Sequence, residues 1–180
     1  MYVTPVEPAD LSPALRGFYD DASPGGKRFI QATAHAGEHA ERFFPYYVGL
    51  RFGTRIGIRL CELLRLAIAQ TTQCPNCLAG RVEAAGLTED LIARLGERDT
   101  TGLTEREAAV VDFAFRFGAD HFSLGEADLR RLHELFDEQE VVEIGMLCAQ
   151  FLGFGRMAMV FGLETPTCPI PVRPVVEQKG

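Results

Sequence analysis

The sequence predicts an all-α fold. No segment alternates apolar and polar residues over the length of a strand, whereas apolar residues recur at helical spacing through most of the chain. Helix start signals support this prediction, because a capping residue is followed three positions later by Glu ahead of three apolar segments. These capping boxes pair Thr104 with Glu107, Ser123 with Glu126 and Asp137 with Glu140.

Length and composition favour a single domain, since 180 residues that are 47% hydrophobic can enclose a sizeable core. We expect an N-terminal surface segment over residues 1–26 with a short helix near 14–19, a helical core over 27–163 and an extended Pro-rich arm over 164–180. The net charge of -7 argues against nucleic-acid binding. Because we find no secretory signal and no long uncharged apolar run, we expect a cytoplasmic protein outside the membrane.

Residues 27–52 predict one or two helices with a break at Pro45. Within them His35 and His39 match HxxEH, a pattern found in some zinc proteases. Gly37 weakens a helix at this point, and no obvious third ligand follows in the sequence. We therefore expect the two histidines to cap or line a helix, and we expect no metal site.

Residues 55–73 are apolar around most of the helix circumference, which predicts a buried helix. Glu62 lies in the middle of it, and a buried carboxylate needs a partner or changes its protonation. An ion pair with Arg59, Arg65 or Arg81 is one interpretation. The other is that Glu62 handles a proton in a reaction.

Directly after this helix comes Cys-Pro-Asn-Cys at residues 74–77. We expect Cys74 at the N-cap and Pro75 at the first position of a second helix that runs to Ala85. The two helices would form an antiparallel hairpin with both thiols in the first turn, where the helix dipole favours a thiolate. On such a hairpin Glu62 and Arg81 would face one pocket.

The CxxC pair allows four interpretations. A thioredoxin-like site needs a preceding strand, and a zinc site needs about four ligands, but the sequence offers neither. A structural pair of cysteines and a helical dithiol peroxidase or disulfide reductase remain. Cys61 and Cys148 lie in apolar helices and are expected to be inert, while Cys168 in the Pro-rich arm has no assigned role.

Residues 60–87 resemble the alkyl hydroperoxidase D (AhpD) and carboxymuconolactone decarboxylase-like family. The family pattern is Glu, then CxxC twelve positions later, then His four positions after the second cysteine. Glu62, Cys74 and Cys77 match this pattern, and the Ala-Ala-Gly-Leu ending also fits, but Arg81 stands where the family has histidine. The resemblance covers about residues 10–163, and it implies an all-helical fold that assembles as dimers, trimers or hexamers.

The resemblance also implies a role for each matching residue and requires no cofactor. Cys77 would attack the peroxide O–O bond and become a sulfenic acid, and Cys74 would resolve it as a disulfide. Glu62 would take part in the proton transfer that activates the thiol, and an external dithiol would reduce the disulfide. Arg81 changes this scheme, because histidine transfers protons near neutral pH whereas arginine stays charged.

Three hypotheses follow from the sequence. The first is a homo-oligomeric thiol-dependent peroxidase or disulfide reductase that acts on a peroxide or another small molecule through Cys74 and Cys77. The second is a non-redox decarboxylase or lyase whose small carboxylated substrate binds the guanidinium fork of Arg81. The third is a helical oligomer that has lost its catalytic activity.

Overall fold

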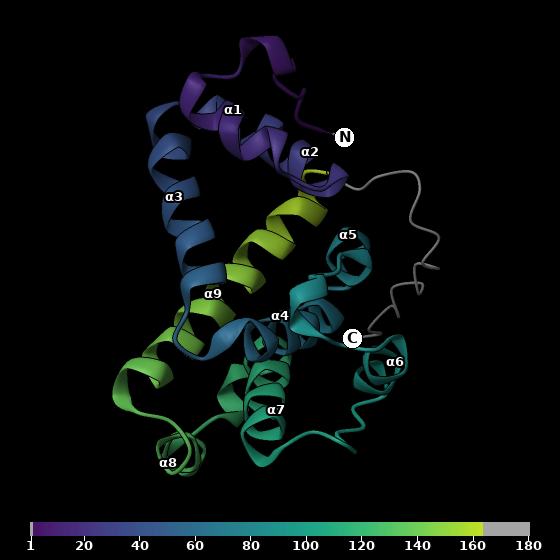
Figure 1. Cartoon of the computed structure of the whole chain (residues 1–180), viewed down its shortest axis with the longest axis vertical. Coiled ribbons are helices and arrows are strands. Elements are labelled where there is room, and N and C mark those ends of the chain that lie inside the picture. The colour runs from purple at the N-terminus through teal and green to yellow at the C-terminus, as the bar shows by residue number, and fades with distance from the viewer. Residues whose placement is uncertain (1, 164–180) are drawn as a thin grey trace, which may run out of the picture.

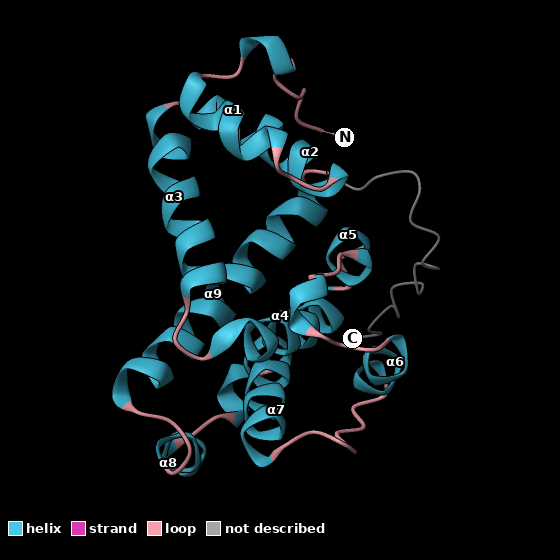
Figure 2. Ribbon diagram, viewed as in Figure 1, coloured by secondary structure: helices cyan, strands magenta, loops and turns pink. Residues whose placement is uncertain are grey.

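The computed structural model describes residues 2–163, and this range contains nine α-helices, four 3-10 helices and no strand (Figures 1 and 2). The all-α prediction is therefore confirmed. The predicted Pro-rich arm and Cys168 lie outside the described residues. The α-helices are α1 Pro13–Asp20, α2 Pro24–Thr33, α3 Glu38–Gly53, α4 Gly57–Thr72, α5 Pro75–Ala79, α6 Glu89–Gly96, α7 Glu105–Ala119, α8 Glu126–His133 and α9 Glu138–Val160. The 3-10 helices are η1 Pro8–Asp10, η2 Ala34–Ala36, η3 Glu83–Ala85 and η4 His121–Ser123.

Helix α4 is the centre of the main core, as the apolar pattern predicts. Every residue from 61 to 69 is buried, and the helix packs mainly against α7 and α9 (Figure 1). Burial of an apolar side chain stabilises the fold by about 1.5–3 kcal/mol, so this stretch fixes α4 firmly in place. The residue that follows the helix, Gln73, has a left-handed backbone with φ of 51° and turns the chain toward the two cysteines.

Helix α9 is long enough and apolar enough to cross a membrane, judged by length and composition alone. Its buried residues include Ile144, Leu147, Cys148 and Phe151, and it packs against α4, α7 and α3. These contacts are those of a core helix in a globular domain.

The first three helices form an N-terminal unit with a small core of its own (Figure 1). Leu11 and Leu15 are buried in this core, so the segment expected on the surface also contributes to the interior. Helix α2 begins at Pro24, before the boundary expected at residue 26. Ring contacts such as that between Phe43 and Phe154, with centroids 4.5 Å apart, join the unit to α9.

The predicted break at Pro45 is wrong. Pro45 lies inside α3, and the break falls at η2 and Gly37, whose φ of 56° is not helical. An internal proline costs a helix about 3 kcal/mol through a lost hydrogen bond and a steric clash. The packing of Phe44, which is buried, and of Tyr47 against neighbouring rings offsets this cost.

Two of the three predicted capping boxes are present, at Thr104 before α7 and at Asp137 before α9. The third is wrong, because α8 begins after Gly125 and the Asp128 carboxylate accepts from the Gly125 backbone N–H at 2.8 Å. The Ser123 hydroxyl is used elsewhere, since it donates to the Asp120 carbonyl oxygen at 2.7 Å within η4.

Candidate active site

The two cysteines of the CxxC lie at the start of α5. Cys74 is the N-cap, its Sγ accepts from the Cys77 backbone N–H at 3.3 Å, and Pro75 takes the first helical position, as predicted. The two sulfur atoms are joined in a disulfide, with Cα atoms 5.2 Å apart. Cys74 is buried with 1% of its surface exposed, whereas Cys77 is half-buried. Solvent therefore reaches the pair from the Cys77 side.

The predicted helix from Cys74 to Ala85 is wrong in its length, because α5 ends at Ala79 and the chain is extended at Gly80. The physical reason lies in the carbonyl groups at the end of α5. The Gly80 carbonyl oxygen accepts from Arg65 Nη2 and from Arg81 Nη1, each at 2.9 Å, and so is not available to a continuing helix. The dipole of such a short helix contributes less to the thiolate than a full second arm would.

Glu62 is buried, with 3% of its surface exposed, and its partner is Arg65. Arg65 Nε donates to one carboxylate oxygen and Nη2 to the other, both at 2.7 Å. Arg51 from α3 lies further away, with Nη2 at 3.8 Å from the carboxylate. Of the three arginines that the sequence offered as partners, the structure selects Arg65, and Arg59 and Arg81 bind elsewhere.

Arg65 also reaches the dithiol segment. Besides the Glu62 carboxylate, it binds the carbonyl oxygen of Cys77 through Nη1 and that of Gly80 through Nη2. One buried guanidinium group therefore connects Glu62 on α4 to the end of α5. The sequence indicated Arg65 only as an ion-pair partner, and the spacing of three residues from Glu62 was the available signal.

Arg81 is exposed and pairs with Glu89 at the start of α6. Its Nε and Nη2 donate to the two oxygens of that carboxylate at 2.7 and 2.9 Å, and these bonds lower the pKa of Glu89 and raise that of Arg81. Arg81 and Glu62 do line one hollow of about 240 Å³, but they form no ion pair with each other. The hollow is further lined by Val82, Glu83, Leu87, Glu89 and Ile92.

The last turn of α4 rests on three glycines from three helices. Gln70 lies against Gly96 of α6, Thr71 against Gly118 of α7 and Thr72 against Gly155 of α9. A Cβ atom at Gly118 would lie 2.3 Å from Thr71 Oγ1, and one at Gly155 would lie 3.3 Å from Thr72 Oγ1. The absence of side chains at these positions lets the helices approach closely and fixes the turn that precedes Cys74.

The residue between the cysteines connects the dithiol to distant parts of the chain. Asn76 Nδ2 donates to the Leu163 carbonyl oxygen at 3.0 Å, just after α9. Gly25 of α2 lies against the same side chain, because a Cβ atom there would be 3.3 Å from Asn76 Cβ. The CxxC turn is thus in contact with α2 near the N-terminus and with the segment after α9.

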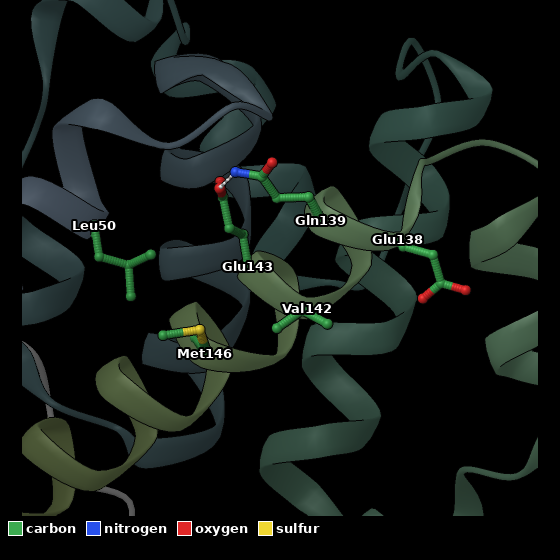
Figure 3. Close-up of a pocket in the computed structure, with 6 residues that line it drawn as sticks. All are labelled: Leu50, Glu138, Gln139, Val142, Glu143 and Met146. Carbon is green, nitrogen blue, oxygen red and sulfur yellow. Dashed lines mark hydrogen bonds between the residues drawn. The ribbon is translucent and has the colours of Figure 1, made fainter.

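A second hollow, of about 510 Å³, lies between the end of α3 and the first half of α9 (Figure 3). Leu50, Val142 and Met146 form its apolar part, and Glu143 is held beside it by a hydrogen bond from Gln139 at 3.1 Å. Helix α9 ends at Val160, 14 residues or about 21 Å beyond Met146, and Leu163, which contacts Asn76, follows that end. This hollow is therefore separate from the dithiol.

The remaining candidate residues form no second site. His35 lies in η2 and His39 in α3, with the non-helical Gly37 between them, and the Thr4 carbonyl oxygen lies 2.8 Å from His35 Nε2. Across residues 2–163, no group of three or more His, Cys, Asp or Glu side chains is arranged to hold a metal ion. Cys61 and Cys148 are buried free thiols, and burial raises the pKa of Cys61 to about 12 and that of Cys148 further.

Two solved structures are similar to this one. The first is an alkylhydroperoxidase AhpD core structure of an uncharacterized peroxidase-related protein from Ralstonia eutropha JMP134. Its TM-score is 0.74 at 20% sequence identity, over 91% of this chain and 90% of that chain. The second is an uncharacterized peroxidase-related protein from Silicibacter sp. TM1040, with a TM-score of 0.65 at 21% identity over 73% of this chain and 72% of that one.

The chain has the AhpD-like fold. The fold predicted from the CxxC pattern is thereby confirmed. No protein-family model and no curated protein sequence matches the chain. At this level of identity the two structures show the fold alone and do not establish a reaction.

Proposed function

We propose that this protein is a thiol-dependent peroxidase or disulfide reductase that uses the Cys74–Cys77 pair. The observation that carries the proposal is the disulfide between a buried and a half-buried cysteine, joined through Arg65 to the buried carboxylate of Glu62. Such a disulfide is the oxidised product of a dithiol cycle. The peroxidase-related neighbours on the same fold support the same reaction class.

The proposed cycle has three balanced steps. The Cys77 thiolate attacks one oxygen of a hydroperoxide, the O–O bond breaks, and the products are a Cys77 sulfenic acid and an alcohol once the leaving oxygen takes a proton. The Cys74 thiolate then attacks the Cys77 sulfur, which forms the disulfide and releases water after protonation. An external dithiol finally reduces the disulfide by exchange and becomes oxidised itself.

Cys77 is assigned the attacking role because it is the more accessible of the two sulfur-bearing residues. Glu62 is assigned the role of proton acceptor for its thiol. The carboxylate is the form of Glu62 that can accept this proton, and Arg65 binds both of its oxygen atoms and fixes its orientation. Arg81, with its guanidinium fork occupied by Glu89, modulates the charge at the entrance to the hollow.

The remaining parts of the proposal concern partners and location. The substrate is a hydroperoxide or a small disulfide, the reductant is an external dithiol, and the working form is a homo-oligomer in the cytoplasm. A reducing compartment suits this cycle, because the disulfide must be reopened after each turnover.

The test is peroxide consumption with dithiothreitol as reductant. Wild type is expected to consume hydrogen peroxide or cumene hydroperoxide faster than Cys77→Ser and Cys74→Ser, both of which cannot complete the cycle. Cys61→Ala is the matched control, because it removes a buried thiol and keeps both cysteines of the site. Equal rates for wild type and Cys77→Ser with both oxidants, and with a disulfide substrate, would exclude the proposed function.

A further inference from the structure

Arg65 is the most highly connected buried charge near the dithiol. Only 6% of its surface is exposed, and its guanidinium group makes four hydrogen bonds, two to Glu62 and one each to the carbonyl oxygens of Cys77 and Gly80. A buried arginine is costly to remove from water, and a single carboxylate partner would be enough to neutralise it. The two further bonds go to the segment that carries the dithiol.

The two carbonyl groups that Arg65 binds lie at the C-terminal end of α5. Cys77 lies in α5 and Gly80 follows its last residue, so Arg65 closes the end of the helix that opens with Cys74. Cations bind favourably at helix carbonyl ends, where backbone acceptors lack partners. Because residues 61–69 of α4 are all buried, with Arg65 among them, Arg65 transfers the rigidity of this stretch to Cys77.

We propose that Arg65 is the positioning residue of the dithiol: through its bonds to Glu62 and to the Cys77 carbonyl oxygen, it holds Cys77 at a fixed place relative to Glu62 and supplies a positive charge at the backbone of Cys77. This inference rests on the proposed function for its biological meaning. It reassigns the cation of the site, because the sequence pattern pointed to Arg81 at that position. Arg81 also binds the Gly80 carbonyl oxygen, but it is exposed and pairs with Glu89. Arg65 is buried and is the arginine that binds the Cys77 carbonyl oxygen.

The surrounding charges set the direction of the effect. Among the described residues, removal of Arg65 leaves the buried Glu62 carboxylate with Arg51 at 3.8 Å as its remaining ion-pair partner. Because Arg65 contacts the Cys77 backbone, its removal makes the surroundings of Cys77 more negative by one charge. A more negative environment disfavours a thiolate, so Cys77 becomes less reactive. The charged groups on the elements around the site are Arg51 of α3, Glu62 and Arg65 of α4, Arg81 after α5, Glu83 of η3 and Glu89 of α6.

The experiment measures the rate at which iodoacetamide alkylates Cys77 in the fully reduced protein, from pH 5 to 10, with each cysteine followed in its own peptide by mass spectrometry. Arg65→Gln is expected to slow alkylation at pH 7 by about tenfold, which corresponds to a rise of about one unit in the Cys77 pKa. Arg65→Lys keeps the charge but not the planar fork, so an intermediate rate is expected.

Two further variants separate positioning from general stability. Arg116→Gln removes an arginine of α7 that also bridges a carboxylate and a carbonyl group, those of Asp128 in α8 and Ser123 in η4. It is expected to leave the Cys77 profile unchanged. Glu62→Gln added to Arg65→Gln is expected to restore part of the lost rate, because the uncompensated negative charge is gone.

Two results would overturn the inference. One is an unchanged Cys77 pH profile in Arg65→Gln and in Arg65→Lys. The other is a shift in Arg116→Gln as large as that in Arg65→Gln. Because no peroxide is used, the outcome is independent of the peroxide-consumption assay. Should Arg65→Gln fail to fold, an Arg65→Lys profile identical to that of wild type would still count against the bridging geometry.

Discussion

Gly118→Ala tests whether the close approach of α7 to the last turn of α4 supports the dithiol segment. The new Cβ atom would lie 2.3 Å from Thr71 Oγ1, 3.0 Å from Thr71 Cβ and 3.1 Å from Thr71 Cγ2. Rotation of the Thr71 side chain brings no relief, because all three atoms are too close. Rotation would also break the hydrogen bond from Thr71 Oγ1 to the Ile68 carbonyl oxygen at 2.8 Å.

The size of the effect follows from two opposing terms. Overpacking of a close-packed core costs about 1–3 kcal/mol, while replacement of a helix glycine by alanine returns about 1 kcal/mol. We therefore expect a net loss of up to about 2 kcal/mol, which lowers the Tm of a domain of this size by up to about 8 °C. Thermal and urea unfolding at one protein concentration measure it.

Gly153→Ala is the matched control for this prediction. Gly153 also lies inside a long helix, α9, but no atom lies within 4 Å of the Cβ position there. The same substitution is therefore expected to leave stability unchanged or to raise it by about 0.5–1 kcal/mol. A Gly118→Ala protein as stable as Gly153→Ala would refute the reasoning that the glycine is needed for close packing.

Two further predictions concern titrating groups. Burial raises the pKa of Cys61 to about 12 and that of Cys148 further. Iodoacetamide at pH 8 should therefore modify neither thiol in the folded protein and both thiols after unfolding. Modification of either thiol in the folded protein would contradict their burial. Burial opposes the charge of Glu107, but hydrogen bonds from Thr104 and Arg59 outweigh it and hold the pKa of Glu107 below its usual 4.5. A pKa that is lowered in the folded state stabilises the protein above pH 4.5, and this stabilisation is lost as the pH falls through the folded-state pKa. Glu107→Gln lacks this contribution. Its urea midpoint should therefore fall less between pH 6 and pH 3 than that of wild type.

The features that local sequence determines were predicted well. The apolar period of residues 55–73, the N-cap at Cys74 with Pro75 after it, and the capping box at Thr104 each depend on residues within one or two helical turns. The AhpD-like fold was implied by the family resemblance that Glu62 and the two cysteines carry, and the similar solved structures confirm it.

The features that depend on distant residues were not predicted. Pro45 stays within α3 because its neighbours in the helix pack against rings from other helices, Phe44 against Phe18 of α1 and Tyr47 against Phe154 of α9. Helix α5 ends early because Arg65 of α4 binds the carbonyl groups at its end. The partner of Glu62 was left open among three arginines, since a sequence does not reveal which guanidinium group is nearest in space. In each case the deciding contact joins elements that lie apart along the chain.

The most direct test of the proposed dithiol cycle is the trapping of a sulfenic acid on Cys77. Cys74→Ser removes the resolving thiol, so one equivalent of hydrogen peroxide should leave Cys77 as a sulfenic acid that dimedone captures. Peptide mass spectrometry should find the dimedone adduct on Cys77 in this variant, and no adduct on Cys74 in the Cys77→Ser variant. An absence of adduct on Cys77, or an adduct on Cys74 formed equally fast in Cys77→Ser, would contradict the assignment of Cys77 as the peroxide-attacking residue.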